Sequence, residues 1–318
     1  MKKIFVVLSM VAFLAACDDS SSASAGQNDD LGIESSSSVE LGSSSSEKTG
    51  KSSSSANDVS SSSEKLSETS SSSVDEVESS SGERDTSQNS AEAKVMPSGT
   101  YDCTKYKCVT TEYLNQKYFE AGVYGEILDE RDGQVYKTVQ IEEQIWMAEN
   151  LNYETGNSYC YNDADSNCTK YGRLYTWAAA VGKTEDECGY GNECGLPSGN
   201  IQGVCPSGWH LSSDTEFETL FTAVGGRSTA GAKLKLQTGW TAYDGITNED
   251  AFGFSALPAG VRYNDGNYDF EGYTAYFWSS TENDSHVAFD MYLSFNYSHA
   301  NLGYDDKSYG FSVRCVKN

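Results

Sequence analysis

The chain has 318 residues, a formal net charge of −25 and an aromatic content of 12%. This acidic excess disfavours nucleic acid and anionic membrane surfaces as partners. All 21 tyrosines and all 5 tryptophans follow residue 97, so a globular region is expected only over residues 98–318. We divide it into a short lead-in at 98–122 and one domain at 123–318, which is long enough to bury a core.

Residues 1–17 have the pattern of a bacterial lipoprotein signal. Two lysines precede the apolar run Ile4–Leu14, which is shorter than the roughly 20 apolar residues that a membrane-spanning helix needs. The run ends in Leu14-Ala-Ala-Cys17, which resembles a lipobox. We therefore expect export, acylation of Cys17 and attachment to the outer membrane at the cell surface, with membrane contact through the lipid alone. An ordinary signal peptide cut at a small residue is the alternative.

Residues 18–97 are predicted to be a disordered, acidic, serine-rich tether. They contain 30 serines and no aromatic residue. A segment with so little apolar surface to bury cannot offset the conformational entropy lost on folding. A glycosylated stalk is the functional alternative that this serine density permits.

Eight cysteines follow Cys17, and an even number in an exported domain favours disulfides. The count allows many connectivities, but pairing neighbours closes small polar loops and leaves Cys205 with Cys315. The expected bonds are Cys103–Cys108 in the lead-in, Cys160–Cys168, Cys188–Cys194 and Cys205–Cys315. Zinc is the rival interpretation and is disfavoured, because there is no Cys-x-x-Cys and no histidine at ligand spacing.

The first half of the domain predicts a hairpin and a helix. Asp132-Gly133 is a turn, the strand Val135–Ile141 follows it, and Gln144–Met147 returns as a second strand. Apolar residues recur on one helical face between Arg173 and Val181, which predicts a short helix there.

The next segment has the clearest helix signal in the chain. A strand at Trp209–Leu211 precedes Ser213-Asp-Thr-Glu216, which matches a capping box. Apolar residues at helical spacing continue from Phe217 to Val224, and Gly225-Gly226 ends the helix.

The last third predicts β structure. Apolar and polar residues alternate from Val287 to Tyr297, with Tyr273–Thr281 as a partner strand and Phe311–Cys315 as a terminal strand. Two short helices and a small antiparallel sheet with long loops define an α+β domain.

Six segments, in the same order, resemble the major paralogous domain of Fibrobacter succinogenes (FISUMP). They are Gln144-Ile-Trp-Met-Ala-Glu-Asn-Leu-Asn152, Tyr171-Gly-Arg-Leu-Tyr-Thr-Trp177, Cys205-Pro-Ser-Gly-Trp-His-Leu211, Gly253-Phe-Ser-Ala-Leu-Pro-Ala-Gly260, Phe277-Trp-Ser-Ser-Thr-Glu282 and Gly310-Phe-Ser-Val-Arg-Cys315. The resemblance implies an exported, surface-attached protein with a C-type lectin-like fold over residues 123–318. It also implies a Cys205–Cys315 bond that joins the Trp209 strand to the terminal strand. It names no biochemical activity.

Two activities known for the C-type lectin-like fold are disfavoured by the residues present. Calcium-dependent lectins carry Glu-Pro-Asn-like and Trp-Asn-Asp-like triplets, whereas Trp278 is followed here by two serines. Formylglycine-generating enzymes need a reactive cysteine pair, whereas every cysteine after Cys17 has an expected structural partner.

Catalytic and metal-binding motifs are sparse, and we predict neither an enzyme nor a bound cofactor. His210 is interpreted as a hydrogen-bonded rim residue, and the other two histidines lie near turns. Asp163-x-Asp165-x-Asn167 resembles the start of a calcium loop but lacks its glycine and its closing glutamate, so we interpret it as a polar turn. Asp244, Asn248 and Asp250 form a second oxygen-rich set, which keeps calcium as an alternative.

Aromatic residues give the strongest functional indication. Five of them alternate with Gly, Asn and Asp in one loop-rich stretch: Tyr263, Tyr268, Phe270, Tyr273 and Tyr276. Such rings suit stacking on carbohydrate or contact with a protein, and packing within the domain is the alternative for each. We therefore predict a non-catalytic domain that binds an extracellular carbohydrate or protein, as in adhesion. An enzyme of the formylglycine-generating class and a purely structural surface protein are the alternatives.

Overall fold

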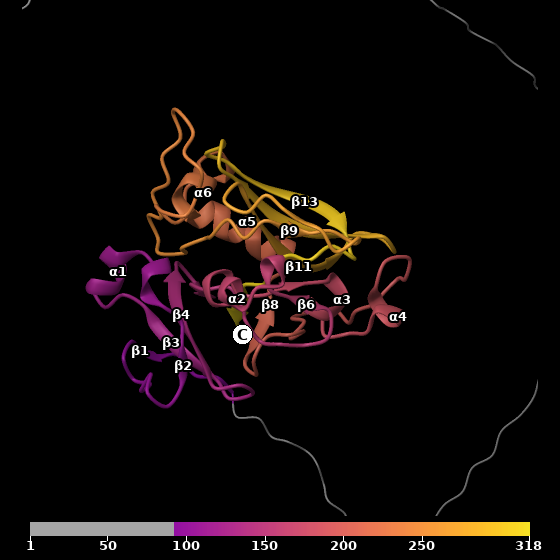
Figure 1. Cartoon of the computed structure of the whole chain (residues 1–318), viewed down its shortest axis with the longest axis horizontal. Coiled ribbons are helices and arrows are strands. Elements are labelled where there is room, and N and C mark those ends of the chain that lie inside the picture. The colour runs from indigo at the N-terminus through magenta and orange to yellow at the C-terminus, as the bar shows by residue number, and fades with distance from the viewer. Residues whose placement is uncertain (1–91) are drawn as a thin grey trace, which may run out of the picture. The chain divides into compact units, whose positions relative to one another are not determined.

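The computed structural model describes residues 92–318 (Figure 1). The predicted signal, Cys17 and nearly all of the predicted tether lie outside the described residues. In the described part, the chain has mixed α and β structure with several small sheets and short helices. None of its helices has the length and the apolar character that crossing a bilayer requires.

The largest sheet joins both ends of the described chain. Its strands are β1 (Met96–Pro97), β2 (Lys107–Cys108), β3 (Gly125–Asp129), β4 (Gln134–Ile141), β5 (Gln144–Met147), β8 (Trp209–Leu211) and β14 (Cys315–Lys317). Their order is β1-β3-β4-β5-β14-β8, all antiparallel, and β2 pairs parallel with β4. The Asp132-Gly133 turn joins β4 to β3, a strand that the sequence did not predict.

The second sheet has three antiparallel strands, β11 (Thr274–Glu282), β12 (Val287–Ser294) and β13 (Ala300–Asp306). The predicted strand up to Tyr297 is therefore too long, because the backbone turns after Ser294 so that β13 can return. Two ribbons complete the β structure. They are β6 (Ser158–Tyr159) with β7 (Leu174–Tyr175), and β9 (Val261–Arg262) with β10 (Tyr268–Asp269).

The described chain has more helices than the two short ones that the sequence predicted. The described helices are α1 (Gln116–Glu120), α2 (Asp165–Tyr171), α3 (Trp177–Ala180), α4 (Glu185–Cys188), α5 (Asp214–Ala223) and α6 (Arg227–Leu234), with 3-10 turns η1 (Thr111–Tyr113) and η2 (Tyr161–Asp163). The capping box of α5 forms as predicted between Ser213 and Glu216. The helix predicted at 173–181 starts only at Trp177, because Tyr175 pairs with Phe311 and Thr176 caps α3.

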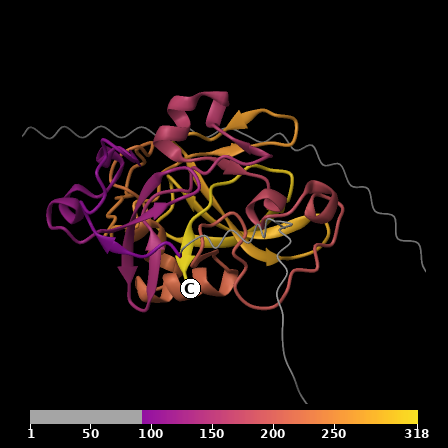
Figure 2. The same cartoon turned by 90° about the horizontal axis from the view of Figure 1, so that it is seen from below.

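The hydrophobic core contains four tryptophans, and four disulfides cross-link the described chain. Trp146, Trp177, Trp209 and Trp278 are all fully buried. Helices α5 and α6 pack against the three-stranded sheet, and Figure 2 shows these orange helices beside the yellow strands. The four disulfides are Cys103–Cys108, Cys160–Cys168, Cys188–Cys194 and Cys205–Cys315, the same pairs that the spacing predicts. Cys205–Cys315 ties the segment before β8 to β14.

Candidate functional site

A buried arginine organises the region in which the candidate site forms. Arg314 is 1% exposed, and its Nε donates to Asn150 Oδ1 at 2.7 Å. Its two terminal nitrogens donate to the carbonyl oxygens of Met147, Phe254 and Ser255. Burial lowers the pKa of the guanidinium to about 9. Because its donors are directed at these fixed acceptors, Arg314 holds three chain segments together and is not available to a ligand.

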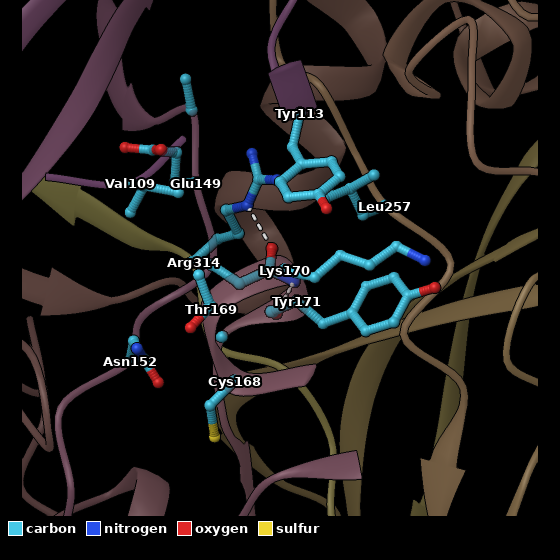
Figure 3. A pocket seen from close by; sticks show the side chains of 13 residues that line it. Val109, Tyr113, Glu149, Asn152, Cys168, Thr169, Lys170, Tyr171, Leu257 and Arg314 are labelled. Carbon is cyan, nitrogen blue, oxygen red and sulfur yellow. Dashed lines mark hydrogen bonds between the residues drawn. The ribbon is translucent and has the colours of Figure 1, made fainter. Parts of the chain in front are cut away.

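A small cavity of about 20 Å³ lies beside Arg314. Glu149, Asn152 and Tyr171 are among its lining residues (Figure 3). Glu149 is only 8% exposed, and its Oε2 accepts a hydrogen bond from the backbone N–H of Lys137 at 2.6 Å. Burial raises the pKa of this carboxyl to about 7. The cavity has room for about one water, so it cannot hold an organic ligand by itself.

A larger, open cleft adjoins this cavity and shares Asn152, Cys168 and Thr169 with it. Its volume of about 320 Å³ falls at the lower end of the range for small-molecule sites. It is lined by residues from β2, β4, the segment after β5, and the α2 region: Lys107, Asp132, Gln134, Asn152, Tyr153, Glu154, Cys160, Asp165, Cys168, Thr169 and Arg173. The Cys160–Cys168 disulfide therefore braces one wall of the cleft.

Asn152, which lines both the cleft and the small cavity, carries an acceptor that the protein leaves unused. The side-chain oxygen Asn152 Oδ1 is buried, and no donor among the described residues reaches it. The backbone N–H of Asn152, in contrast, donates to the hydroxyl of Tyr136 at 2.9 Å, which holds the residue in place. A buried carbonyl oxygen without a partner loses free energy relative to water, so a donor from solvent or from a ligand is favoured there.

Charges of both signs surround the cleft, with three carboxylates against two cations. Arg173 donates to the carbonyl oxygen of Ser158 at 3.1 Å and pairs with Glu154 Oε2 at 3.1 Å. Partial burial raises the pKa of Asp132. This balance does not favour an anion, but it supplies donors and acceptors suited to a neutral ligand with many hydroxyl groups.

One aromatic ring lines the cleft. The guanidinium of Arg131 lies 3.8 Å from the centroid of Tyr153 and is itself held by Asp129, with Nε–Oδ1 at 2.8 Å. Tyr175 donates its hydroxyl to the Tyr153 carbonyl oxygen at 2.7 Å. Side chain and backbone of Tyr153 are thus both positioned before any ligand arrives.

The five aromatic residues singled out in the sequence do not line this cleft. Tyr276 lies between Tyr292 and Phe311, with ring centroids at 5.0 and 4.5 Å, so it packs within the domain. Tyr263 packs on Tyr309 at 5.2 Å. Tyr268 packs on Tyr161 and donates its hydroxyl to Asp163 Oδ1 at 2.6 Å, which supports the loop behind the cleft wall.

The other two predicted aromatic residues are exposed. Phe270 is 41% exposed and Tyr273 is 44% exposed. Tyr273 packs edge-on against Phe295, which does the same with Tyr243, at centroid distances of 5.0 and 5.5 Å. Tyr243, Tyr273 and Phe295, here called the aromatic triad, form a second surface that a ligand can contact.

The two oxygen-rich sets considered for calcium have other partners. Asp163 accepts the Tyr268 hydroxyl, and the carboxylate of the fully buried Asp250 accepts from the Ser255 N–H and hydroxyl at 2.8 and 2.9 Å. Residues 92–318 contain no group of three or more His, Cys, Asp or Glu side chains arranged to hold a metal ion.

His210 is hydrogen-bonded as expected, but its predicted position at the rim is wrong. It is 2% exposed and lies between Glu216 and Asn318, each at 2.7 Å, because the capping glutamate of α5 reaches back over β8.

The model of the Fibrobacter succinogenes major domain family matches residues 139–317. Comparison with curated proteins and with solved structures finds no match. The matched range contains Asn152, Tyr153 and the α2 wall of the cleft, whereas Lys107, Asp132 and Gln134 precede it. The cleft is therefore built jointly by the family domain and the segment ahead of it. No sequence motif indicated this joint construction, because it depends on the parallel pairing of β2 with β4.

Proposed function

The chain belongs to the Fibrobacter succinogenes major domain family, and we propose that it binds an extracellular carbohydrate without catalysis. The observation that carries the proposal is the polar cleft of about 320 Å³ with its unpaired acceptor, Asn152 Oδ1. Sugar hydroxyls both donate and accept hydrogen bonds, so one sugar can satisfy the carboxylates, the amide and the cations of the cleft together. The nearby Tyr153 ring offers an apolar surface of the kind on which sugars stack.

The described residues support a binding role over a catalytic one. All eight cysteines of the region are in disulfides, so none offers a thiolate nucleophile. His210 is held by two partners, and none of the three histidines lines the cleft. The alternative, an enzyme of the formylglycine-generating class, requires free thiols. Thiol counting on the denatured, unreduced protein separates the two, because two free thiols favour the enzyme.

We also propose that the domain has the C-type lectin-like fold. Two observations support it: the FISUMP resemblance, and the Cys205–Cys315 bond beside the antiparallel pairing of β8 with β14. An experimental structure that superimposes on that fold would establish the assignment, and a different strand order would reject it.

The site of action is proposed to be the cell surface, with the protein anchored in the outer membrane by a lipid on Cys17. The lipobox-like sequence motivates this proposal, and the four disulfides agree with an oxidising compartment. Mass spectrometry of the N-terminal peptide tests it. A diacylated or triacylated cysteine is expected, and an unmodified Cys17 within an uncut leader contradicts it.

A glycan array and sedimentation with insoluble polysaccharides test the carbohydrate proposal on the chain from residue 18 onward. Asn152→Ala removes an unpaired oxygen and leaves the backbone bond to Tyr136, so the fold should be retained. We expect affinity to fall roughly five-fold, which corresponds to the loss of one hydrogen bond of about 1 kcal/mol. Tyr273→Ala is the matched control at the aromatic triad and should bind like the wild type. No binding to any glycan would refute the proposal.

A protein ligand is the second candidate, and the exposed aromatic triad is the observation that favours it. Exposed tyrosines are enriched in protein interfaces. If Tyr273→Ala abolishes attachment to a surface protein while Asn152→Ala does not, this second candidate replaces the first.

A further inference from the structure

The middle strand of the three-stranded sheet contains a buried carboxylate without a partner. Asp290 on β12 is 0% exposed, and neither of its carboxylate oxygens has a hydrogen-bond partner among the described residues. Lys307, which lies two residues beyond Asp305, donates instead to Glu282 and to the carbonyl oxygen of Asn192, at 2.5 and 2.9 Å. An isolated buried carboxylate is costly, so it either takes up a proton or gains a compensating cation.

The neighbouring strand leaves room beside this carboxylate. Gly303 on β13 lies directly opposite Asp290 in the antiparallel register. A Cβ added to Gly303 would lie 3.5 Å from Asp290 Oδ2 and 3.8 Å from Oδ1. Because side chains alternate along a strand, Asn301 and Asp305 flank this glycine on the same face of the sheet. The register therefore places three oxygen-bearing side chains, Asp290, Asn301 and Asp305, on one face of the sheet around the missing Cβ.

The second carboxylate, Asp305, also forms no ion pair with a cation within residues 92–318. It is half-buried, and burial together with Asp306 raises its pKa to about 6. Burial and Asp305 raise the pKa of Asp290 well above its usual range. Two aromatic residues of β11 lie on this face: Trp278 lies opposite Asp290, and Tyr276 packs on Tyr292. Ala288 lies opposite Asp305. Two carboxylates thus lie on one face of the sheet, close enough for Asp305 to act on Asp290, and Asp290 is covered.

We propose that Asp290 and Asp305 bind one calcium ion, with the Asn301 amide oxygen as a further ligand. Two carboxylates and a neutral amide are hard oxygen ligands of the type that Ca²⁺ prefers. Their two negative charges match a divalent cation. Ca²⁺ tolerates irregular coordination and carboxylates that bind through one or both oxygens, whereas Mg²⁺ requires a near-octahedral shell. The site is independent of the polar cleft and does not depend on sugar binding.

Thermal unfolding of the full chain tests the calcium site. The protein is treated with a chelator, dialysed, and melted at pH 7.5 without metal, with Ca²⁺ and with Mg²⁺. At a hundred-fold excess over Kd, Ca²⁺ should raise Tm by about 5–10 °C for a domain of this size. Mg²⁺ should have a smaller effect, and isothermal titration should give one Ca²⁺ per chain. No shift with Ca²⁺, or a larger shift with Mg²⁺, overturns the proposal.

Substitutions locate the ion. Asp290→Asn should abolish the Ca²⁺-dependent shift and should raise Tm of the metal-free protein, because the buried charge is removed. Gly303→Ala should weaken Ca²⁺ binding while both carboxylates remain, since the added methyl group fills the space beside Asp290. Should Asp290→Asn fail to fold, Asp305→Asn decides, because its side chain is only half-buried. Asp163→Asn, at the exposed end of η2, is the control that must keep the full shift. A shift that survives the substitutions in β12 and β13 places the ion elsewhere and overturns the proposal.

Discussion

Replacing Glu149 by glutamine is expected to stabilise the protein at alkaline pH and to leave its stability nearly unchanged in acid. Glutamine has the same shape and keeps an oxygen that can accept the N–H of Lys137. It removes only the ionisable proton of a carboxyl that is 8% exposed.

The magnitude follows from the pKa of Glu149, which burial raises from 4.5 to about 7. Below pH 4.5 the carboxyl is protonated in both the folded and the unfolded chain, so it costs nothing. As pH rises towards 7 the unfolded chain loses the proton first, and the folded state is therefore progressively destabilised. Above pH 7 the full cost remains, about 3 kcal/mol for a shift of this size.

Urea unfolding of the wild type and Glu149→Gln at pH 4.5 and pH 8 measures this difference. The variant should be more stable by up to about 3 kcal/mol at pH 8 and by less than about 0.5 kcal/mol at pH 4.5. Glu143→Gln, at the exposed turn between β4 and β5, is the matched control and should show no pH-dependent difference. An equal effect of Glu149→Gln at both pH values, or destabilisation at pH 8, would refute the reasoning. In the latter case Arg314 would require the negative charge of Glu149.

Three further predictions follow from packing and connectivity. Replacing both cysteines of Cys205–Cys315, which are 110 residues apart, should lower the free energy of unfolding by about 5 kcal/mol. Replacing both cysteines of Cys103–Cys108, which are 5 residues apart, should lower it by about 2 kcal/mol, and paired denaturant titrations measure the difference. Arg314→Met should lower stability by at least about 3 kcal/mol, because four buried acceptors lose their donor, and an unchanged urea midpoint would contradict this. Tyr276→Ala should lower the free energy of unfolding by about 3 kcal/mol, because the Tyr276 ring stacks on Phe311, whereas Tyr273→Ala should lower it by less than about 0.5 kcal/mol. Equal values would mean that the packing assigned to Tyr276 is wrong.

Local signals in the sequence predicted the local structure well. The capping box of α5 forms because Ser213 and Glu216 satisfy each other's backbone N–H groups without tertiary help. The disulfide pairs followed from spacing, since neighbouring cysteines close short polar loops. The alternation of apolar and polar residues correctly predicted the start of strand β12.

Features that depend on tertiary packing could not be predicted from the sequence. The alternation in β12 suggested that Asp290 lies on a polar face, yet both faces of the strand are covered. Helices α5 and α6 cover one side, while Phe311 packs on Tyr276 and Trp278 on the other. The cleft was equally unpredictable, because the distant lead-in strand β2 contributes Lys107 to it. Of the aromatic residues chosen from the sequence, Tyr263, Tyr268 and Tyr276 pack against other rings. The presence of an aromatic residue in the sequence does not tell whether its side chain is packed or exposed.

The most direct test of carbohydrate binding is a crystal structure of the chain with the oligosaccharide that binds best in the array. The sugar should lie in the cleft between Lys107 and Arg173, with a hydroxyl donating to Asn152 Oδ1. An oligosaccharide bound at the aromatic triad, with none in the cleft, would contradict the proposal that the cleft is the carbohydrate site.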